Sequence, residues 1–192
     1  MSERKHFFRA FLRDAGKVGA IAPSSQELGR LMLDWMDWDS IDCVVEFGAG
    51  TGVFTELVPQ YLKPGAAFFT IERDPVLAGI TRSRCPEVTL HETCVSQVAA
   101  LCHKEGVEQV DAIICGLPWA SFSSELQEEF LGAMFGVLPT GGQFATFAYW
   151  QGLLLPAGQR FRRFLKEHFR TVEQSPTAWR NLPPAFVYRC ER

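Results

Sequence analysis

The feature that most restricts how this chain can fold is the stretch VVEFGAGTG at residues 44–52. An apolar run that ends in the carboxylate of Glu46 leads directly into three closely spaced glycines, Gly48, Gly50 and Gly52. Such apolar runs are typical of buried strands, and clustered glycines allow a tight turn whose backbone approaches a ligand. The stretch therefore predicts a strand, a ligand-binding turn and a helix, in that order.

Apolar runs of strand length alternate with segments of helical spacing along the rest of the chain. The expected strands cover residues 41–46, 67–71, 87–90, 110–115 and 143–148. The expected helices cover residues 53–62, 75–83, 94–104, 124–138 and 157–169, and two closing strands are expected at 170–179 and 184–190. This alternation predicts an α/β fold with a parallel sheet between helices, closed by an antiparallel pair.

Composition excludes several classes of protein. A chain of 192 residues suits one sizeable domain, and its formal charge of -3 gives no overall attraction to nucleic acids. The six cysteines form no C-x-x-C pair, and Cys43, Cys115 and Cys190 lie inside apolar runs, which favours reduced, buried thiols over disulfides or metal ligands. No apolar stretch is long enough to cross a membrane and no separate signal core is present, so we expect a cytoplasmic protein.

The glycine spacing distinguishes among the ligands that such a turn can bind. A phosphate-binding P-loop requires a lysine that this turn lacks, and the dinucleotide fingerprint requires a glycine where Val53 stands. The carboxylate of Glu46 would repel a pyrophosphate, but it suits the ammonium and sulfonium of S-adenosylmethionine. A second acid, Glu72, ends the next expected strand, where it can accept hydrogen bonds from both ribose hydroxyls. S-adenosylmethionine is therefore the predicted cofactor, with Ala49 and Arg73 as further contacts.

The combination of VVEFGAGTG with FTIE at 69–72 resembles the class I S-adenosylmethionine-dependent methyltransferases, and the resemblance extends from Ser24 to Arg192. It implies a Rossmann-like, seven-stranded, mostly parallel sheet with an antiparallel last strand and helices on both faces. It also implies a polar group near the adenine in the segment LHETCVS, after the third strand. Thr93 and Cys94 are the candidates, and Glu92 is the nearest acid.

The stretch DAIICGLPWASF follows the fourth expected strand and reaches the edge of the sheet where ligands bind. Its GLPW core resembles the N-L-P-Y loop of ribosomal-RNA adenine dimethylases, with glycine in place of the asparagine. Without that amide, the loop suits an aliphatic amine better than a nucleobase, because backbone carbonyls and an indole face can hold an alkylammonium. The predicted acceptor contacts are Gly116, Leu117, Pro118, Trp119 and Tyr149. No histidine shows motif spacing, so the general base stays unassigned.

The N-terminal segment SERKHFFRAFLRDAGKVGAIAPSS has helical spacing, with phenylalanines on one face and arginines around them. This pattern is typical of a helix that lies in a membrane interface, and an amphipathic lid over the core has the same pattern. We expect residues 1–20 to form such an anchor or lid and residues 21–192 to form the methyltransferase domain. A second basic and aromatic stretch, QRFRRFLKEHFR at 159–170, is expected to be a helix whose cationic face meets lipid phosphates or solvent.

Three stretches, HFFRAFLRDAGKVGAIAPSS, GLPWASF and NLPPAFVYRC, resemble bacterial phospholipid N-methyltransferases, which include phosphatidylethanolamine and ornithine-lipid methyltransferases. The resemblance implies methylation of a lipid headgroup amine at an anionic membrane surface, without nucleic acid as a partner. It also implies that Ser24 and Ser25, at a helix N-terminus, bind the cofactor carboxylate. Arg180 and Asn181 are further candidates for headgroup contacts.

The leading prediction is therefore an N-methyltransferase that acts on phosphatidylethanolamine or its methylated derivatives, peripherally bound to the inner membrane leaflet. The first alternative is an ornithine-lipid N-methyltransferase, and the second is a ribosomal-RNA adenine N6-dimethyltransferase. A binding module without turnover would keep the glycine turn as well. The sequence does not indicate the oligomeric state, the headgroup or the number of methyl groups transferred.

Overall fold

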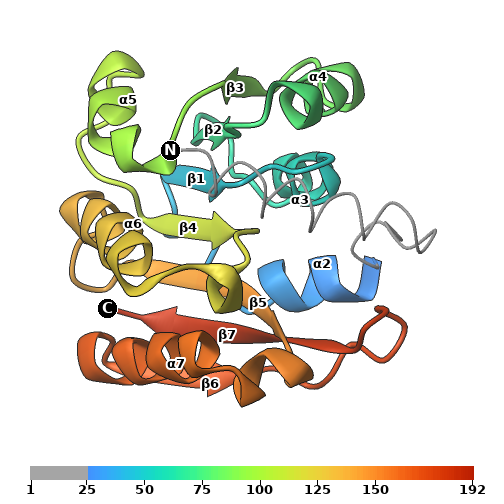
Figure 1. Ribbon diagram of the computed structural model, residues 1–192. Coiled ribbons are helices and arrows are strands. Elements are labelled where there is room, and N and C mark those ends of the chain that lie inside the picture. Colours follow the sequence, from blue (N-terminus) through green and yellow to red (C-terminus); the bar gives the residue numbers. More distant parts are fainter. Residues whose placement is uncertain (1–25) are drawn as a thin grey trace.

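The computed structural model describes residues 26–192, so the expected N-terminal helix over 1–20 and the candidates Ser24 and Ser25 lie outside the described residues. Seven strands form one sheet in the order β3-β2-β1-β4-β5-β7-β6 (Figure 1). Their bounds are β1 Cys43–Phe47, β2 Ala67–Ile71, β3 Thr89–His91, β4 Ala112–Cys115, β5 Gln143–Tyr149, β6 Thr171–Gln174 and β7 Ala185–Glu191. Among these strands β7 runs antiparallel to both of its neighbours, and the other pairs are parallel. The predicted Rossmann-like sheet is confirmed.

Helices cover both faces of this sheet (Figure 1). The α-helices described are α2 Gln26–Leu33, α3 Val53–Leu57, α4 Pro75–Arg84, α5 Val98–Lys104, α6 Ser124–Val137 and α7 Pro156–His168. Short 3-10 helices are η1 Val58–Gln60, η2 Val95–Gln97, η3 Trp119–Ser121 and η4 Trp150–Leu154. Between residues 26 and 192, none of the helices has the length and apolar character needed to cross a bilayer.

The core divides into two layers because successive side chains of a strand point to opposite faces of the sheet. Val45 and Phe47 of β1 pack in the layer that α5, α6 and α7 cover. Val44 of the same strand packs in the layer that α2 and α3 cover. All residues of β1 and β4 are buried, as expected for central strands of a parallel sheet. The carboxyl ends of these two strands carry the candidate site.

Two expected elements end earlier than their apolar patterns suggest. The helix expected over 53–62 becomes η1 after Leu57, because Pro59 has no N–H for a further α-helical hydrogen bond. The strand expected over 170–179 is regular only as β6, up to Gln174, and Pro176 cannot donate to the ladder. Pairing with β7 resumes only as an isolated bridge between Ala178 and Ala185.

The cysteines are free thiols, as the sequence predicts. Cys43 and Cys115 are buried in central strands, and Cys190 is buried in β7. Burial raises the pKa of Cys115 to about 12, so this thiol stays protonated at neutral pH. These side chains therefore contribute to packing.

Candidate active site

The glycine turn joins β1 to α3 with a backbone that other residues rarely adopt. Gly48, Gly50 and Gly52 have φ angles of 78°, 59° and 81°, all in the left-handed region. The N–H of Gly48 donates to the carbonyl of Ile71 at 2.8 Å, which ties the turn to the end of β2. A Cβ on Gly48 would lie 2.7 Å from a methyl group of Leu117. The conformation therefore favours glycine at this position, and a side chain there would also displace Leu117.

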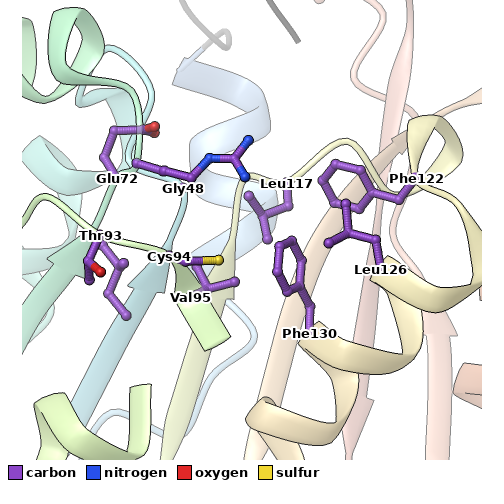
Figure 2. A pocket seen from close by; sticks show the side chains of 11 residues that line it. Gly48, Glu72, Thr93, Cys94, Val95, Leu117, Phe122, Leu126 and Phe130 are labelled. Carbon is purple, nitrogen blue, oxygen red and sulfur yellow. The ribbon is translucent and has the colours of Figure 1, made fainter. Parts of the chain in front are cut away.

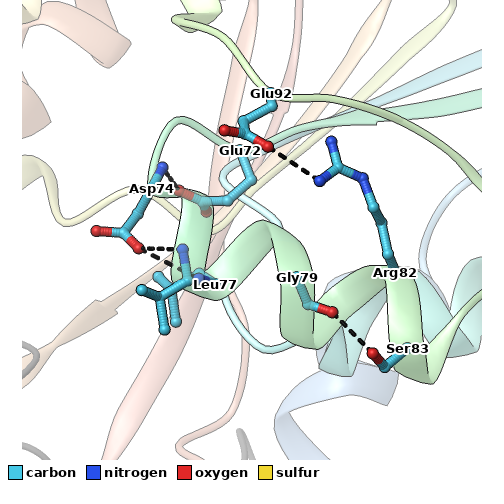
Figure 3. A network of polar contacts seen from close by, with 8 residues as sticks. Glu72, Asp74, Leu77, Gly79, Arg82, Ser83 and Glu92 are labelled. Atoms are coloured by element: carbon cyan, nitrogen blue, oxygen red, sulfur yellow. Dashed lines mark hydrogen bonds and ion pairs between the residues drawn. The ribbon is translucent and has the colours of Figure 1, made fainter.

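Glu72 follows β2 and holds the turn from the other side. Its Oε2 accepts the N–H of Gly50 at 2.9 Å. Its Oε1 accepts the N–H of Asp74 at 2.8 Å (Figure 3). Burial raises the pKa of this carboxyl, and hydrogen bonds from the backbone N–H groups of Asp74, Gly50 and Arg73 oppose the shift. A carboxylate accepts hydrogen bonds and donates none, and Glu72 lines a pocket, so it can also accept from the hydroxyls of a ribose.

A pocket, which we call the cofactor pocket, opens between Glu72 and the apolar side of α6 (Figure 2). It has about 420 Å³ of empty space, including its mouth. Figure 2 shows Glu72, Thr93 and Cys94 on one side of this pocket and Leu117 and Phe122 on the other. Its walls unite five residues predicted to bind the cofactor with several apolar ones, and the full lining is Gly48, Ile71, Glu72, Arg73, Thr93, Cys94, Val95, Leu117, Phe122, Leu126 and Phe130. A polar end beside an apolar end suits a ribose that carries a base.

Glu92, the nearest acid after β3, has a different partner. Its carboxylate forms an ion pair with Arg82 of α4 at 2.9 Å (Figure 3). Both side chains are substantially exposed, at 40% and 49%. Thr93 and Cys94 therefore supply the pocket wall after β3, whereas Glu92 pairs at the surface.

Glu46 lies behind the turn and is fully buried. Its Oε2 accepts the hydroxyl of Thr55, in α3, at 2.6 Å. Burial raises the pKa of Glu46 to about 7, and hydrogen bonds from Thr55 and Thr70 oppose the shift. Its Oε1 has no hydrogen-bond partner among residues 26–192. Glu46 is not among the residues that line the pocket beside Glu72, and its contact with the cofactor's ammonium stays a prediction.

The GLPW loop after β4 lies directly against the glycine turn. The N–H of Gly116 donates to the carbonyl of Phe47 at 2.8 Å. A Cβ on Gly116 would lie 2.6 Å from the carbonyl oxygen of Gly48. No side chain fits there without a backbone shift, which gives a physical reason for glycine at this position in place of asparagine. The GLPW loop and the glycine turn of the cofactor pocket are therefore in direct contact.

A second pocket extends from Gly116 away from the glycine turn, with about 670 Å³ of empty space. We call it the acceptor pocket. Its lining is aromatic, aliphatic or small, without a charged side chain, and consists of Gly116, Pro118, Trp119, Ala120, Ser121, Phe147, Ala148, Tyr149, Gly152, Leu153, Gly158, Phe161 and Tyr188. Four of the five predicted acceptor residues lie in this wall, and the fifth, Leu117, lies in the wall of the cofactor pocket.

Trp119 and Tyr149 present aromatic groups to the acceptor pocket. Trp119 is buried and stacks on Phe161 of α7, with ring centroids 4.5 Å apart and planes 9° from parallel. Burial raises the pKa of the Tyr149 hydroxyl, and a hydrogen bond with the Asn181 side chain opposes the shift. The Tyr149 hydroxyl therefore stays protonated at neutral pH and acts as a hydrogen-bonding group rather than a strong base.

Two residues that sequence reasoning missed hold this pocket together. Gln127 of α6 is buried, and its amide donates to the carbonyls of Trp119 at 2.7 Å and Ala157 at 3.1 Å. Tyr188 of β7 lies in the wall and packs edge-on against Phe161. The stretch that contains α7 was expected to present a cationic face, and its apolar face is what lines the pocket. The signal was the spacing of Gly158, Phe161 and Leu165, which are buried on one side of α7.

Comparison with known proteins places this geometry in a known class. No protein-family model matches the chain. The chain is 32% identical over 188 residues to an ornithine lipid N-methyltransferase of Singulisphaera acidiphila, covering 96% of this chain and 93% of that protein. Among solved structures it is similar to an O-methyltransferase from Bacillus cereus in complex with S-adenosylhomocysteine, with a TM-score of 0.69, 14% identity, and coverage of 97% and 91% of the two chains. It is also similar to the O-methyltransferase TomG from Streptomyces achromogenes in complex with S-adenosylmethionine, with a TM-score of 0.67, 15% identity, and coverage of 88% and 81%.

The sheet order and these likenesses show that the chain has the fold of the class I S-adenosylmethionine-dependent methyltransferases. Within that class, the chain belongs to the family of the ornithine lipid N-methyltransferase from Singulisphaera acidiphila.

Proposed function

We propose that this chain transfers methyl groups from S-adenosylmethionine to the headgroup amine of an ornithine lipid. The observation that carries the proposal is the acceptor pocket, which begins at Gly116 beside the cofactor turn and has no charged side chain in its lining. An ornithine headgroup reaches its amine through a short aliphatic chain, which suits aromatic and aliphatic walls. The named relative supports the same substrate class.

In this proposal the protein contributes position and desolvation. Bound S-adenosylmethionine supplies a methyl group on a positively charged sulfur. Glu72 orients the ribose, and the contact between Gly48 and Gly116 brings the acceptor pocket to the cofactor. Holding an amine in line with the methyl group converts a bimolecular step into an effectively unimolecular one.

The acceptor amine must lose a proton before its lone pair can attack. A lysine-like amine has a reference pKa of about 10.4 in water, and an apolar environment lowers that value because it disfavours the charged form. The Tyr149 hydroxyl offers an oxygen that can accept a hydrogen bond from the amine. The proton leaves to solvent, the nitrogen–carbon bond forms and the sulfur–carbon bond breaks.

Phosphatidylethanolamine is the second candidate substrate. Its phosphate would need a cation near the pocket, and the candidate is Arg180, which is exposed and precedes Asn181, a hydrogen-bond partner of Tyr149. We place it second because the relative named above is an ornithine lipid N-methyltransferase. An adenine in RNA is disfavoured because the close approach at Gly116 leaves no room for the amide that would read it.

The proposal places the enzyme peripherally on the cytoplasmic leaflet of the inner membrane. The basic and aromatic pattern of residues 1–20 supports an interfacial anchor or lid, and Ser24 and Ser25 are proposed to bind the cofactor carboxylate.

Purified protein should be supplied in parallel with ornithine lipid vesicles, phosphatidylethanolamine vesicles and ribosomal RNA, each with methyl-labelled S-adenosylmethionine. We expect label in ornithine lipid, with weaker transfer to phosphatidylethanolamine and none to RNA. The matched variant Trp119→Leu should lose lipid methylation while it keeps S-adenosylhomocysteine affinity within about twofold. Exclusive labelling of phosphatidylethanolamine or RNA would overturn the assignment to ornithine lipid.

A further inference from the structure

The exposed apolar side chains of the described residues are concentrated in one region. Seven large apolar side chains between residues 26 and 192 are exposed, and five of them lie on η4, directly after it, or on the segment between β6 and β7. The most exposed of these five are Leu154 at 79%, Trp179 at 72% and Leu182 at 67%. Exposed clusters of this kind mark sites of contact with a partner or a membrane. We call the five residues Trp150, Leu154, Leu155, Trp179 and Leu182 the η4 surface.

Direct contacts join the two segments that form the η4 surface. The indole N–H of Trp150 donates to the hydroxyl of Thr177 at 3.2 Å. The Trp150 ring also packs on Phe186 of β7, with centroids 4.8 Å apart. The two segments are therefore held side by side by the sheet, and the exposed side chains belong to one folded surface.

The charge around the η4 surface differs from that of the whole chain. Residues 150–184 contain six arginines or lysines and two acids, although the chain has a formal charge of -3. Arg162, Arg163 and Lys166 of α7 border an open hollow together with Leu153 of η4. Apolar and aromatic side chains flanked by cations match an anionic bilayer, in which apolar groups enter the interface and cations meet phosphates.

The η4 surface also borders the acceptor pocket. Gly152 and Leu153 of η4 line that pocket, while Trp150 and Leu154 of the same short helix are exposed. We infer that the η4 surface docks on an anionic lipid bilayer, so that the acceptor pocket opens toward the membrane that holds its substrate. The orientation of the acceptor pocket toward the membrane rests on the proposed function. The docking surface itself does not depend on residues 1–20.

The test compares vesicle binding of full-length proteins that differ only in this surface. Vesicles of phosphatidylcholine with phosphatidylglycerol serve as the probe, and binding is measured by co-sedimentation. The double variant Leu154→Ser/Trp179→Ser should lose at least about tenfold in vesicle affinity, because two apolar side chains no longer leave water. The matched control is Val76→Ser/Ile80→Ser, which removes the other two exposed apolar side chains, both on α4, and should change the affinity less than twofold.

Two further measurements test whether the cations of α7 and the side chain of Trp179 contact the bilayer. Arg162→Gln/Arg163→Gln/Lys166→Gln should weaken binding to anionic vesicles by roughly fivefold per charge and reduce its salt dependence. The Trp179→Phe variant should lose part of the quenching of tryptophan emission by brominated lipids, because Trp179 enters the bilayer. The inference would be overturned if the double variant bound vesicles as tightly as the unsubstituted protein. It would also be overturned if the unsubstituted protein formed a concentration-dependent dimer that the same substitutions abolish.

The docking inference and the proposed function can fail separately. The double variant should still methylate ornithine lipid dispersed in detergent at close to the unsubstituted rate, while it is slow on vesicles. Methylation that falls equally in detergent and on vesicles would contradict docking through this surface. Absence of lipid methylation in the unsubstituted protein would contradict the proposed function and leave the vesicle-binding comparison intact.

Discussion

At the scale of single residues, Glu72 combines a structural and a binding task. Its two oxygens accept the N–H groups of Gly50 and Asp74, and the side chain lines the cofactor pocket. Hydrogen bonds to a charged group contribute about 1.5–3 kcal/mol each, so loss of two ribose contacts should weaken binding by at least about a hundredfold. Calorimetry with S-adenosylhomocysteine should show this loss for Glu72→Ala. The control Glu92→Ala removes a surface carboxylate paired with Arg82 and should leave the dissociation constant within twofold. Equal dissociation constants for the two variants would exclude the ribose role of Glu72.

Glu46 predicts a pH dependence of stability. Its pKa in the folded protein is about 7, above the ordinary value of 4.5, because it is buried. Between these two values the folded state holds a proton that the unfolded state has lost, so stability falls by about 1.4 kcal/mol per pH unit and levels off above pH 7. Glu46→Gln should remove this contribution. Between pH 5 and pH 8, urea unfolding should show the free energy of unfolding of the unsubstituted protein falling by roughly 3 kcal/mol relative to that of the variant. Parallel pH profiles of the two proteins would contradict a buried, proton-binding Glu46.

At the scale of elements, Gln127 braces the acceptor pocket by connecting η3, α6 and α7. Its amide satisfies the carbonyls of Trp119 and Ala157, and its carbonyl accepts from Arg160 at 3.2 Å. Gln127→Leu leaves two carbonyls without this donor, which should lower the free energy of unfolding by about 2–4 kcal/mol. Because the pocket wall loosens, the KM for the lipid acceptor should rise more than the dissociation constant of S-adenosylhomocysteine.

The control for Gln127→Leu is its exposed neighbour on α6, Glu128→Gln, which should change stability by less than about 0.5 kcal/mol. Equal effects on acceptor KM and cofactor affinity would show that Gln127 stabilises the whole fold rather than positioning the acceptor loop.

The central strands β1, β2 and β4 could be predicted from sequence because each lies within a short apolar run. β2 coincides with its expected range, and β1 and β4 differ from theirs by at most two residues at each end. The failures occur where one residue overrides a longer pattern, as Pro59 does after α3 and Pro176 does after β6. Hydrophobic spacing cannot show such breaks, because it does not record which backbone N–H must donate.

At the scale of the whole molecule, cofactor binding should stabilise the fold as a unit. A ligand that binds only the folded state contributes about 2.7 kcal/mol at a concentration of 100 times its dissociation constant. For a chain of 192 residues this corresponds to a rise in the thermal midpoint of roughly 5–10 °C. S-adenosylhomocysteine should produce this rise, whereas ATP and NAD should not. A similar rise with NAD would contradict the prediction that the glycine turn binds S-adenosylmethionine rather than a dinucleotide.

The candidate site was predictable to the extent that its residues follow one another in the chain. The glycine turn, Glu72 and the GLPW loop are local patterns at the ends of β1, β2 and β4, which are neighbours in the sheet, so their meeting follows from the parallel topology. The spacing in α7 could place Phe161 on an apolar face, but it could not show that this face meets Tyr188, because only tertiary packing brings α7 and β7 to the same pocket. The η4 surface has the same origin, since its exposure follows from which side of each segment the sheet covers.

The most direct test of the central claim is mass spectrometry of lipids from cells that make ornithine lipids and express this chain. We predict a new series of ornithine lipids whose masses increase by one methyl substitution at a time, located on the headgroup amine, and absent when Glu72→Ala is expressed at the same level. An unchanged ornithine lipid profile in cells that contain folded, cofactor-binding protein would contradict the claim.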